Sequence, residues 1–153
     1  MLQLEGDKTL AQDPSVCWAK LSDPGFLLEC IPNAEQSGSV GQEGSDEIQF
    51  KLRPGVSFIR GTLDVTIKVE KVELGGPVKS VRYLIHSRAI GSSSDAEALL
   101  KLESVAGGTH VSWTILIKTL GGLLKAVPQG LIKASAQKVI TDIWSAVEKK
   151  LTA

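Results

Sequence analysis

The chain has 153 residues, a length typical of one domain with a buried core. Lysine and arginine together number 17, as do aspartate and glutamate, so no net charge draws the protein toward nucleic acid, which we exclude as a partner. Apolar residues make up 42% of the chain and aromatic residues 5%, which favours a packed aliphatic core over a disordered or fibrous chain.

The N-terminal residues and the cysteines indicate the cellular compartment. Residues 1–10 carry Glu5, Asp7 and Lys8 and lack the basic start and apolar run of a secretory signal. No run of about eighteen apolar residues is present to span a bilayer. Cys17 and Cys30 are too few and too far apart for a disulfide framework or a thiolate zinc site. We therefore expect a soluble cytoplasmic protein with reduced, buried thiols.

Residues 2–10 are expected to be extended, and two short helices follow them. Asp13-Pro14 places an acidic N-cap residue before a proline at the first helical position, which predicts a helix start. Asp23-Pro24 ends this helix, and a second one is expected from Pro24 to Cys30. Both helices are too short to form a core alone, so we expect them to cover part of a larger one.

From residue 34 to residue 118 the hydrophobic period becomes two, which is typical of strands in an antiparallel meander. Gly and Pro punctuate this region, as at Pro54-Gly55 and in residues 75–77. The alternation changes phase between Val69 and Val72, which predicts a bulge. The strands are expected at residues 34–44, 47–52, 62–74, 81–86, 97–103 and 110–118.

After Gly121-Gly122 the period returns to 3.6 residues, and Pro128 supplies a helix-start residue for a helix from about 128 to 151. On a helical wheel its apolar residues form one stripe, opposite lysines and other polar residues. The stripe consists of Ile132, Ala136, Val139, Ile140, Ile143 and Val147.

These elements predict an α+β fold in which a seven-stranded curved antiparallel sheet wraps around a long C-terminal helix. The sheet is too long to stay flat, and only the last helix is long enough to fill its concave side. Because one helix contacts only the middle of a curved sheet, we expect an apolar gap at one end of it. Such a gap is a ligand pocket by default.

Several motifs occur in a characteristic order: VCWAKLSDP at 16–24, ECIPNAE at 29–35, the turn 54–62, GGTHV at 107–111 and GGLL at 121–124. Together they resemble the carbon monoxide dehydrogenase CoxG family of the START-like (SRPBCC, Bet v 1-like) helix-grip superfamily. The resemblance implies a single START-like domain over residues 1–153, without a cofactor, that assists a carbon monoxide dehydrogenase-type molybdenum hydroxylase. Family members carry Gly where this chain has Asn33, a residue that also tolerates left-handed backbone.

The chain contains no Gly-x-Ser-x-Gly elbow, His-Glu-x-x-His helix, phosphate loop or dinucleotide fingerprint, so we assign no catalytic residue and no metal ligand. His86, His110, Arg60 and Arg82 fall on the expected outer face of their strands, where we interpret them as surface residues.

Inward-facing aromatic and aliphatic residues define the expected pocket. Tyr83 either donates to a ligand oxygen or is satisfied by the backbone, and the alternation does not distinguish these. Trp113 and Trp144 are more typical of core packing than of a ligand platform. The residues expected to line the pocket are Phe50, Phe58, Tyr83, Ile85, Trp113, Ile115, Ile132, Ala136 and Ile140.

Charge is unevenly distributed along the chain. From Lys118 onward six lysines face only Asp142 and Glu148, so this part carries +4 and the rest −4. The apolar segment Leu120 to Ile132 contains Lys125 and either contacts the inner face of the membrane as a pocket gate or simply seals the core.

Three functional hypotheses follow. The first is non-enzymatic binding or carriage of a lipophilic small molecule, such as a lipid, quinone or polyketide-like compound. The second is a polyketide cyclase or aromatase-like enzyme in which Tyr83 or a nearby acid moves a proton. The third is a partner-binding module with a filled core and no cavity.

Overall fold

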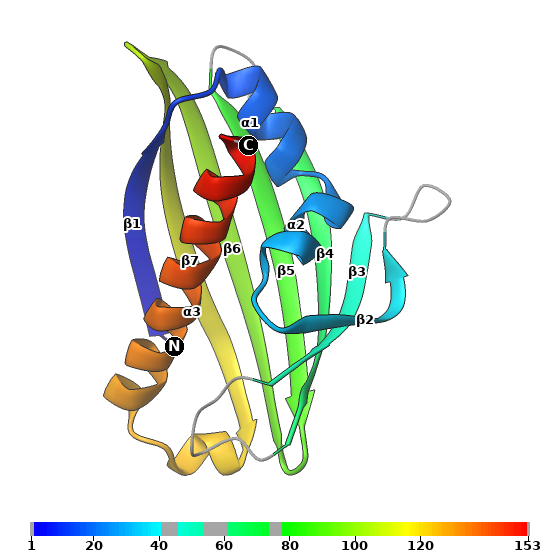
Figure 1. Cartoon of the computed structure of the whole chain (residues 1–153). Coiled ribbons are helices and arrows are strands. Elements are labelled where there is room, and N and C mark those ends of the chain that lie inside the picture. The colour runs from blue at the N-terminus through cyan, green and yellow to red at the C-terminus, as the bar shows by residue number, and fades with distance from the viewer. Residues whose placement is uncertain (1, 41–45, 54–60, 74–77, 153) are drawn as a thin grey trace.

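The computed structural model describes residues 2–40, 46–53, 61–73 and 78–152, and in it one long helix lies along the concave face of a seven-stranded antiparallel sheet (Figure 1). The strand order is β1-β7-β6-β5-β4-β3-β2, which confirms the predicted fold. The elements are β1 (Leu2–Leu10), α1 (Pro14–Leu21), α2 (Pro24–Cys30), β2 (Ala34–Val40), β3 (Glu47–Leu52), β4 (Leu63–Glu73), β5 (Lys79–Ala89), β6 (Ser92–Val105), β7 (Gly108–Gly122), the 3-10 helix η1 (Leu123–Ala126) and α3 (Gln129–Leu151).

The period-two pattern is confirmed in the strands that form the middle of the sheet. Ile48, Val81, Leu102 and Val111 come from β3, β5, β6 and β7, and each is fully buried beneath the helices. Their sequence neighbours point to the other face, because successive side chains of a strand alternate between the two faces. The concave face is therefore the core face of the domain.

The bulge predicted near Val72 is wrong. The ladder between β4 and β5 runs without a register shift from Asp64 to Glu73. The apolar phase breaks there because Lys71 lies over the ring of Trp18 from α1, with its Nζ 5.5 Å from the ring centroid. A cation above an indole ring replaces an apolar contact at this position. The register shift between β6 and β7 occurs instead at Asp95 and Ala96.

The two proline-initiated helices are confirmed and cover one end of the sheet. The side chain of Asp23 accepts a hydrogen bond from the Gly25 amide at 3.0 Å, whereas Asp13 caps α1 without a side-chain bond. The indole of Trp18 donates to the carbonyl of Ser80 at 2.9 Å, which attaches α1 to β5. Asn33 follows α2 with φ of 62°, so the asparagine adopts the left-handed backbone expected of it.

Helix α3 begins directly after Pro128, as predicted, and its C-terminal half is fixed to the rest of the domain by polar contacts. The side-chain amide of Gln12 donates to the carbonyl of Leu151 at 3.1 Å. Lys8 of β1 pairs with Glu148 at 2.7 Å. These contacts fix the distance between the helix and the first strand. No helix within the described ranges is long and apolar enough to cross a membrane.

Candidate functional site

An apolar cavity of about 140 Å³ lies between the sheet and the middle of α3. The strands β4 to β7 form its floor, α3 forms its roof, and α1 and α2 close one end. The lining residues are Leu21, Leu27, Ile31, Ile67, Tyr83, Ile85, Ala98, Leu100, Trp113, Ile115, Ile140, Ile143, Trp144 and Val147.

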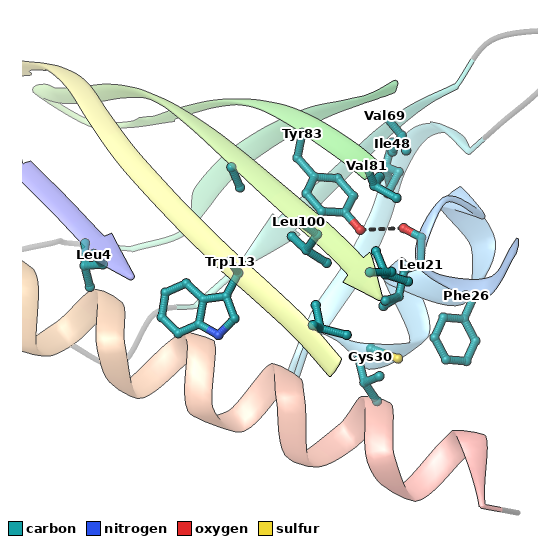
Figure 2. Close-up of a cluster of buried hydrophobic side chains, with 14 of the residues drawn as sticks. Leu4, Leu21, Phe26, Cys30, Ile48, Val69, Val81, Tyr83, Leu100 and Trp113 are labelled. Carbon is teal, nitrogen blue, oxygen red and sulfur yellow. Dashed lines mark hydrogen bonds between the residues drawn. The ribbon is translucent and has the colours of Figure 1, made fainter. Parts of the chain in front are cut away.

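Trp113 forms one wall of this cavity, and a glycine makes room for it. The ring projects from β7 toward α3 (Figure 2). Gly6 is paired with Trp113 across the β1–β7 ladder. A Cβ atom on Gly6 would lie 2.8 Å from Cε2 and 3.2 Å from Cη2 of the indole, closer than van der Waals contact allows. The absence of a side chain at Gly6 therefore sets the position of the ring.

Tyr83 is satisfied by the backbone, which decides between the two alternatives left by the sequence. Its hydroxyl donates to the carbonyl of Leu21 in a buried hydrogen bond (Figure 2). Burial raises the pKa of the Tyr83 hydroxyl far above its ordinary value, and the charge of the Cys30 thiolate raises it further. The phenol therefore stays neutral and its proton is already committed.

The structure brings together five of the nine residues expected to line the pocket: Tyr83, Ile85, Trp113, Ile115 and Ile140. Three others lie away from the cavity, and Phe58 is outside the described residues, as is Arg60.

The displaced three are in the core near the cavity rather than in its wall. Phe50 is buried on β3, against which α2 packs, and Ile132 is buried in the first turns of α3. Ala136 packs against the core one turn before Ile140. Alternation identifies an inward side chain, but it does not show how far along the sheet the cavity extends, and this is why these three were misplaced.

Sequence reasoning missed the wall contributed by the short helices. Leu21, Leu27 and Ile31 line the cavity, although their own segment contains no pocket signal. Ile143 and Val147 belong to the predicted apolar stripe of α3, so their spacing from Ile140 was the one signal that pointed to them.

A second, more open cleft of about 310 Å³ lies on the other side of α3. Ile31 lines both this cleft and the apolar cavity, so the two adjoin. Polar groups dominate its rim, and Lys138 and Asp142 form a long ion pair of 3.7 Å there. The lining residues are Ile31, Pro32, Asn33, Leu52, Arg53, Ala134, Ser135, Lys138, Val139 and Asp142.

The histidines and Arg82 lie on the outer face of the sheet, as predicted, and each has a carboxylate partner. His86 Nδ1 lies 2.6 Å from Asp95, and His110 Nε2 lies 3.2 Å from Asp7. Hydrogen bonding from His86 lowers the pKa of Asp95, with a second hydrogen bond and a small charge effect in the same direction. In the described part of the chain no three metal-binding side chains come together.

Both cysteines are free and buried, which confirms the expectation from their spacing. Desolvation raises the pKa of the Cys30 thiol to about 11, the nearby charge of Lys150 offsetting part of the effect. Desolvation also raises the pKa of Cys17. Neither thiol is thus in the electropositive, accessible setting that activates a nucleophilic cysteine.

A curved antiparallel sheet that holds a C-terminal helix above an apolar cavity defines the START-like class of ligand-binding domains. Solved structures support this class. A conserved protein from Geobacillus kaustophilus superposes with a TM-score of 0.82 at 21% identity, covering 99% of this chain and 95% of that one. A START superfamily protein from Mycobacterium smegmatis superposes with a TM-score of 0.65 at 10% identity, covering 97% and 95%.

The sequence identifies the family within this class. The sequence profile of the CoxG family, a family of carbon monoxide dehydrogenase subunits, matches residues 6–152. The chain belongs to the CoxG family, as its motifs predicted. No match was found among curated proteins.

Proposed function

We propose that this protein binds and carries a lipophilic small molecule in the cavity between the sheet and α3. The observation that carries this proposal is the chemistry of the lining, which consists almost entirely of aliphatic and aromatic carbon. A dry apolar void costs packing energy unless something fills it, and apolar ligands enter such voids readily. The fold class supports the same conclusion, since START-like domains are ligand-binding folds.

The size of the cavity limits the ligand. Its volume of about 140 Å³ is well below the roughly 300 Å³ at which pockets for drug-sized molecules begin. A slender chain, such as an acyl or isoprenoid tail, therefore fits better than a fused-ring polyketide. This favours the lipid and quinone classes among the ligands considered.

The cyclase or aromatase alternative has no support in the geometry. Proton transfer requires a titratable group within hydrogen-bond reach of the substrate. Among the described residues that line the cavity, only Tyr83 is titratable, and its hydroxyl is held by Leu21. The alternative of a partner-binding module with a filled core also loses support, because the core is not filled.

The family description motivates a more specific role. We propose that the cytoplasmic protein assists a carbon monoxide dehydrogenase-type molybdenum hydroxylase by moving a lipophilic molecule, such as a quinone, between that enzyme and the membrane. Reciprocal co-purification of the two proteins from their host tests the partnership. An enzyme recovered free of this protein under low-salt conditions would contradict it.

Membrane contact is proposed at the end of the molecule that contains η1. Leu123 and Leu131 are 64% and 47% exposed there. Ile90, 85% exposed, lies beside them because the Leu123 amide donates to the carbonyl of Gly91 at 2.8 Å. Exposed apolar side chains near Lys125 suit an interface with anionic lipid. Flotation with phosphatidylglycerol vesicles tests this contact, and Val105→Ser at an exposed turn elsewhere is the control for Leu123→Ser.

Native mass spectrometry of the protein purified from its own host tests the central proposal. We expect a co-purifying lipophilic compound that is lost on denaturation. In a second assay, the neutral fluorescent probe N-phenyl-1-naphthylamine should bind the wild type, and Ala98→Leu should weaken it because Ala98 lines the cavity. Ala96→Leu, two residues away on the same strand face, is the matched control. Equal probe binding by both variants would contradict the proposed site.

A further inference from the structure

The apolar cavity leaves the polar end of a ligand without a binding partner. The hydroxyl of Tyr83 is committed to the Leu21 carbonyl, and the remaining lining is hydrocarbon apart from the two indoles. The ligands of lipophilic carriers usually bear at least one oxygen, and a buried oxygen without a hydrogen-bond partner is unfavourable. The head group of a ligand must therefore lie outside this cavity.

The open cleft on the other side of α3 is placed to receive that head group. Ile31 borders both spaces, so a chain leaving the cavity past Ile31 enters the cleft directly. Helix α3 lines both spaces with two different stripes. Ile140, Ile143 and Val147 face the cavity, whereas Ser135, Lys138 and Asp142 face the cleft at the same helical spacing.

The charges of the cleft favour an anion. Arg53 at the end of β3 and Lys138 on α3 both line it, and Asp142 is the one acid among its described lining residues. The ion pair between Lys138 and Asp142 is long, at 3.7 Å, and both side chains are solvent-exposed, so it holds the ammonium weakly. In the described part of the chain Arg53 has no carboxylate within ion-pair distance. Its planar guanidinium can bind two oxygens of one anionic group.

We propose that this cleft is the head-group site for an amphipathic ligand with an anionic head, a carboxylate or a phosphate monoester, whose apolar chain occupies the cavity. Arg53 binds the head through paired hydrogen bonds, and Lys138 adds a second positive charge from the opposite wall. Ser135 and the side-chain amide of Asn33 line the same cleft and supply neutral donors. The inference rests on the proposed carrier function, because it assumes that the cavity takes the chain.

The test measures how ligands of one chain length displace N-phenyl-1-naphthylamine at pH 7 and low salt. The ligands are dodecanol, dodecanoic acid and dodecyl phosphate. We expect at least one of the two anions to bind about tenfold more tightly than the alcohol, as expected for charge-assisted hydrogen bonds. Comparison of the acid with the phosphate identifies which head group the cleft prefers.

Variants locate the effect. Arg53→Gln combined with Lys138→Gln should reduce the preference for the anion to about twofold or less while leaving dodecanol affinity unchanged. Lys133→Gln removes a charge from the same helix outside the cleft and should keep the full preference. Melting temperatures control for folding, and the exposed positions of all three residues make unfolding a minor concern.

The outcomes separate this inference from the proposed function. If the probe and dodecanol bind but neither anion gains affinity, or if the preference survives in the double variant, the head-group site is refuted and the carrier function stands. If neither the probe nor any of the three ligands binds, both are refuted.

Discussion

Replacement of Gly6 by alanine tests the packing that shapes the cavity. The new Cβ would lie 2.8 Å from Cε2 and 3.2 Å from Cη2 of Trp113, whereas ordinary contacts lie at 3.4–4 Å. The indole or strand β1 must therefore move. Overpacking of this kind costs about 1–3 kcal/mol. Loss of backbone freedom in the unfolded chain offsets about 0.5–1 kcal/mol of this.

The net effect of Gly6→Ala is a loss of roughly 1–2 kcal/mol in the free energy of unfolding, which corresponds to a fall of about 2–8 °C in Tm for a domain of this size. Urea denaturation followed by tryptophan fluorescence measures it. Because Trp113 lines the cavity, probe affinity should fall as well. Gly130→Ala is the control, since no atom lies within 4 Å of its Cβ and its backbone is helical. This variant should be stabilised by up to about 1 kcal/mol.

A double-mutant cycle assigns the cause. In a Trp113→Leu background the indole is gone, so Gly6→Ala should become neutral or stabilising, with a coupling energy of at least about 1 kcal/mol. Equal destabilisation in both backgrounds would show that the indole is not the obstacle. A Gly6→Ala protein as stable as the wild type would refute the packing argument altogether.

Three further variants or conditions test other parts of the structure. Tyr83→Phe leaves the carbonyl of Leu21 without its donor and should cost about 1–3 kcal/mol in urea denaturation; unchanged stability would contradict a buried bond. Asp95, whose pKa is lowered below its ordinary 3.8 by His86, stabilises the fold above that value, so Tm should fall as the pH drops through the lowered pKa, and Asp95→Asn should flatten this acid limb. Cys30, with its pKa raised to about 11, should resist iodoacetamide at pH 8 in the native state and react when denatured; rapid native labelling would refute its burial.

The local pattern of the sequence was enough to determine the elements and the fold. Period-two alternation identified the strands, the Asp-Pro pairs identified both short helices, and the apolar stripe identified α3. These signals are reliable because strand and helix periodicity, proline geometry and capping all act within a few residues. The family motifs act in the same way, since each one occupies a short segment.

Only the tertiary structure decided how the cavity is built. Gly6 lies opposite Trp113 because β1 pairs with β7, and Tyr83 loses its free hydroxyl because Leu21 reaches it from a helix 62 residues away in the chain. Lys71 replaces an apolar residue because Trp18 lies beneath it. Each contact depends on register and packing between distant segments, which local periodicity does not encode. The same reason explains why the cleft that contains Arg53 carried no signal in the sequence.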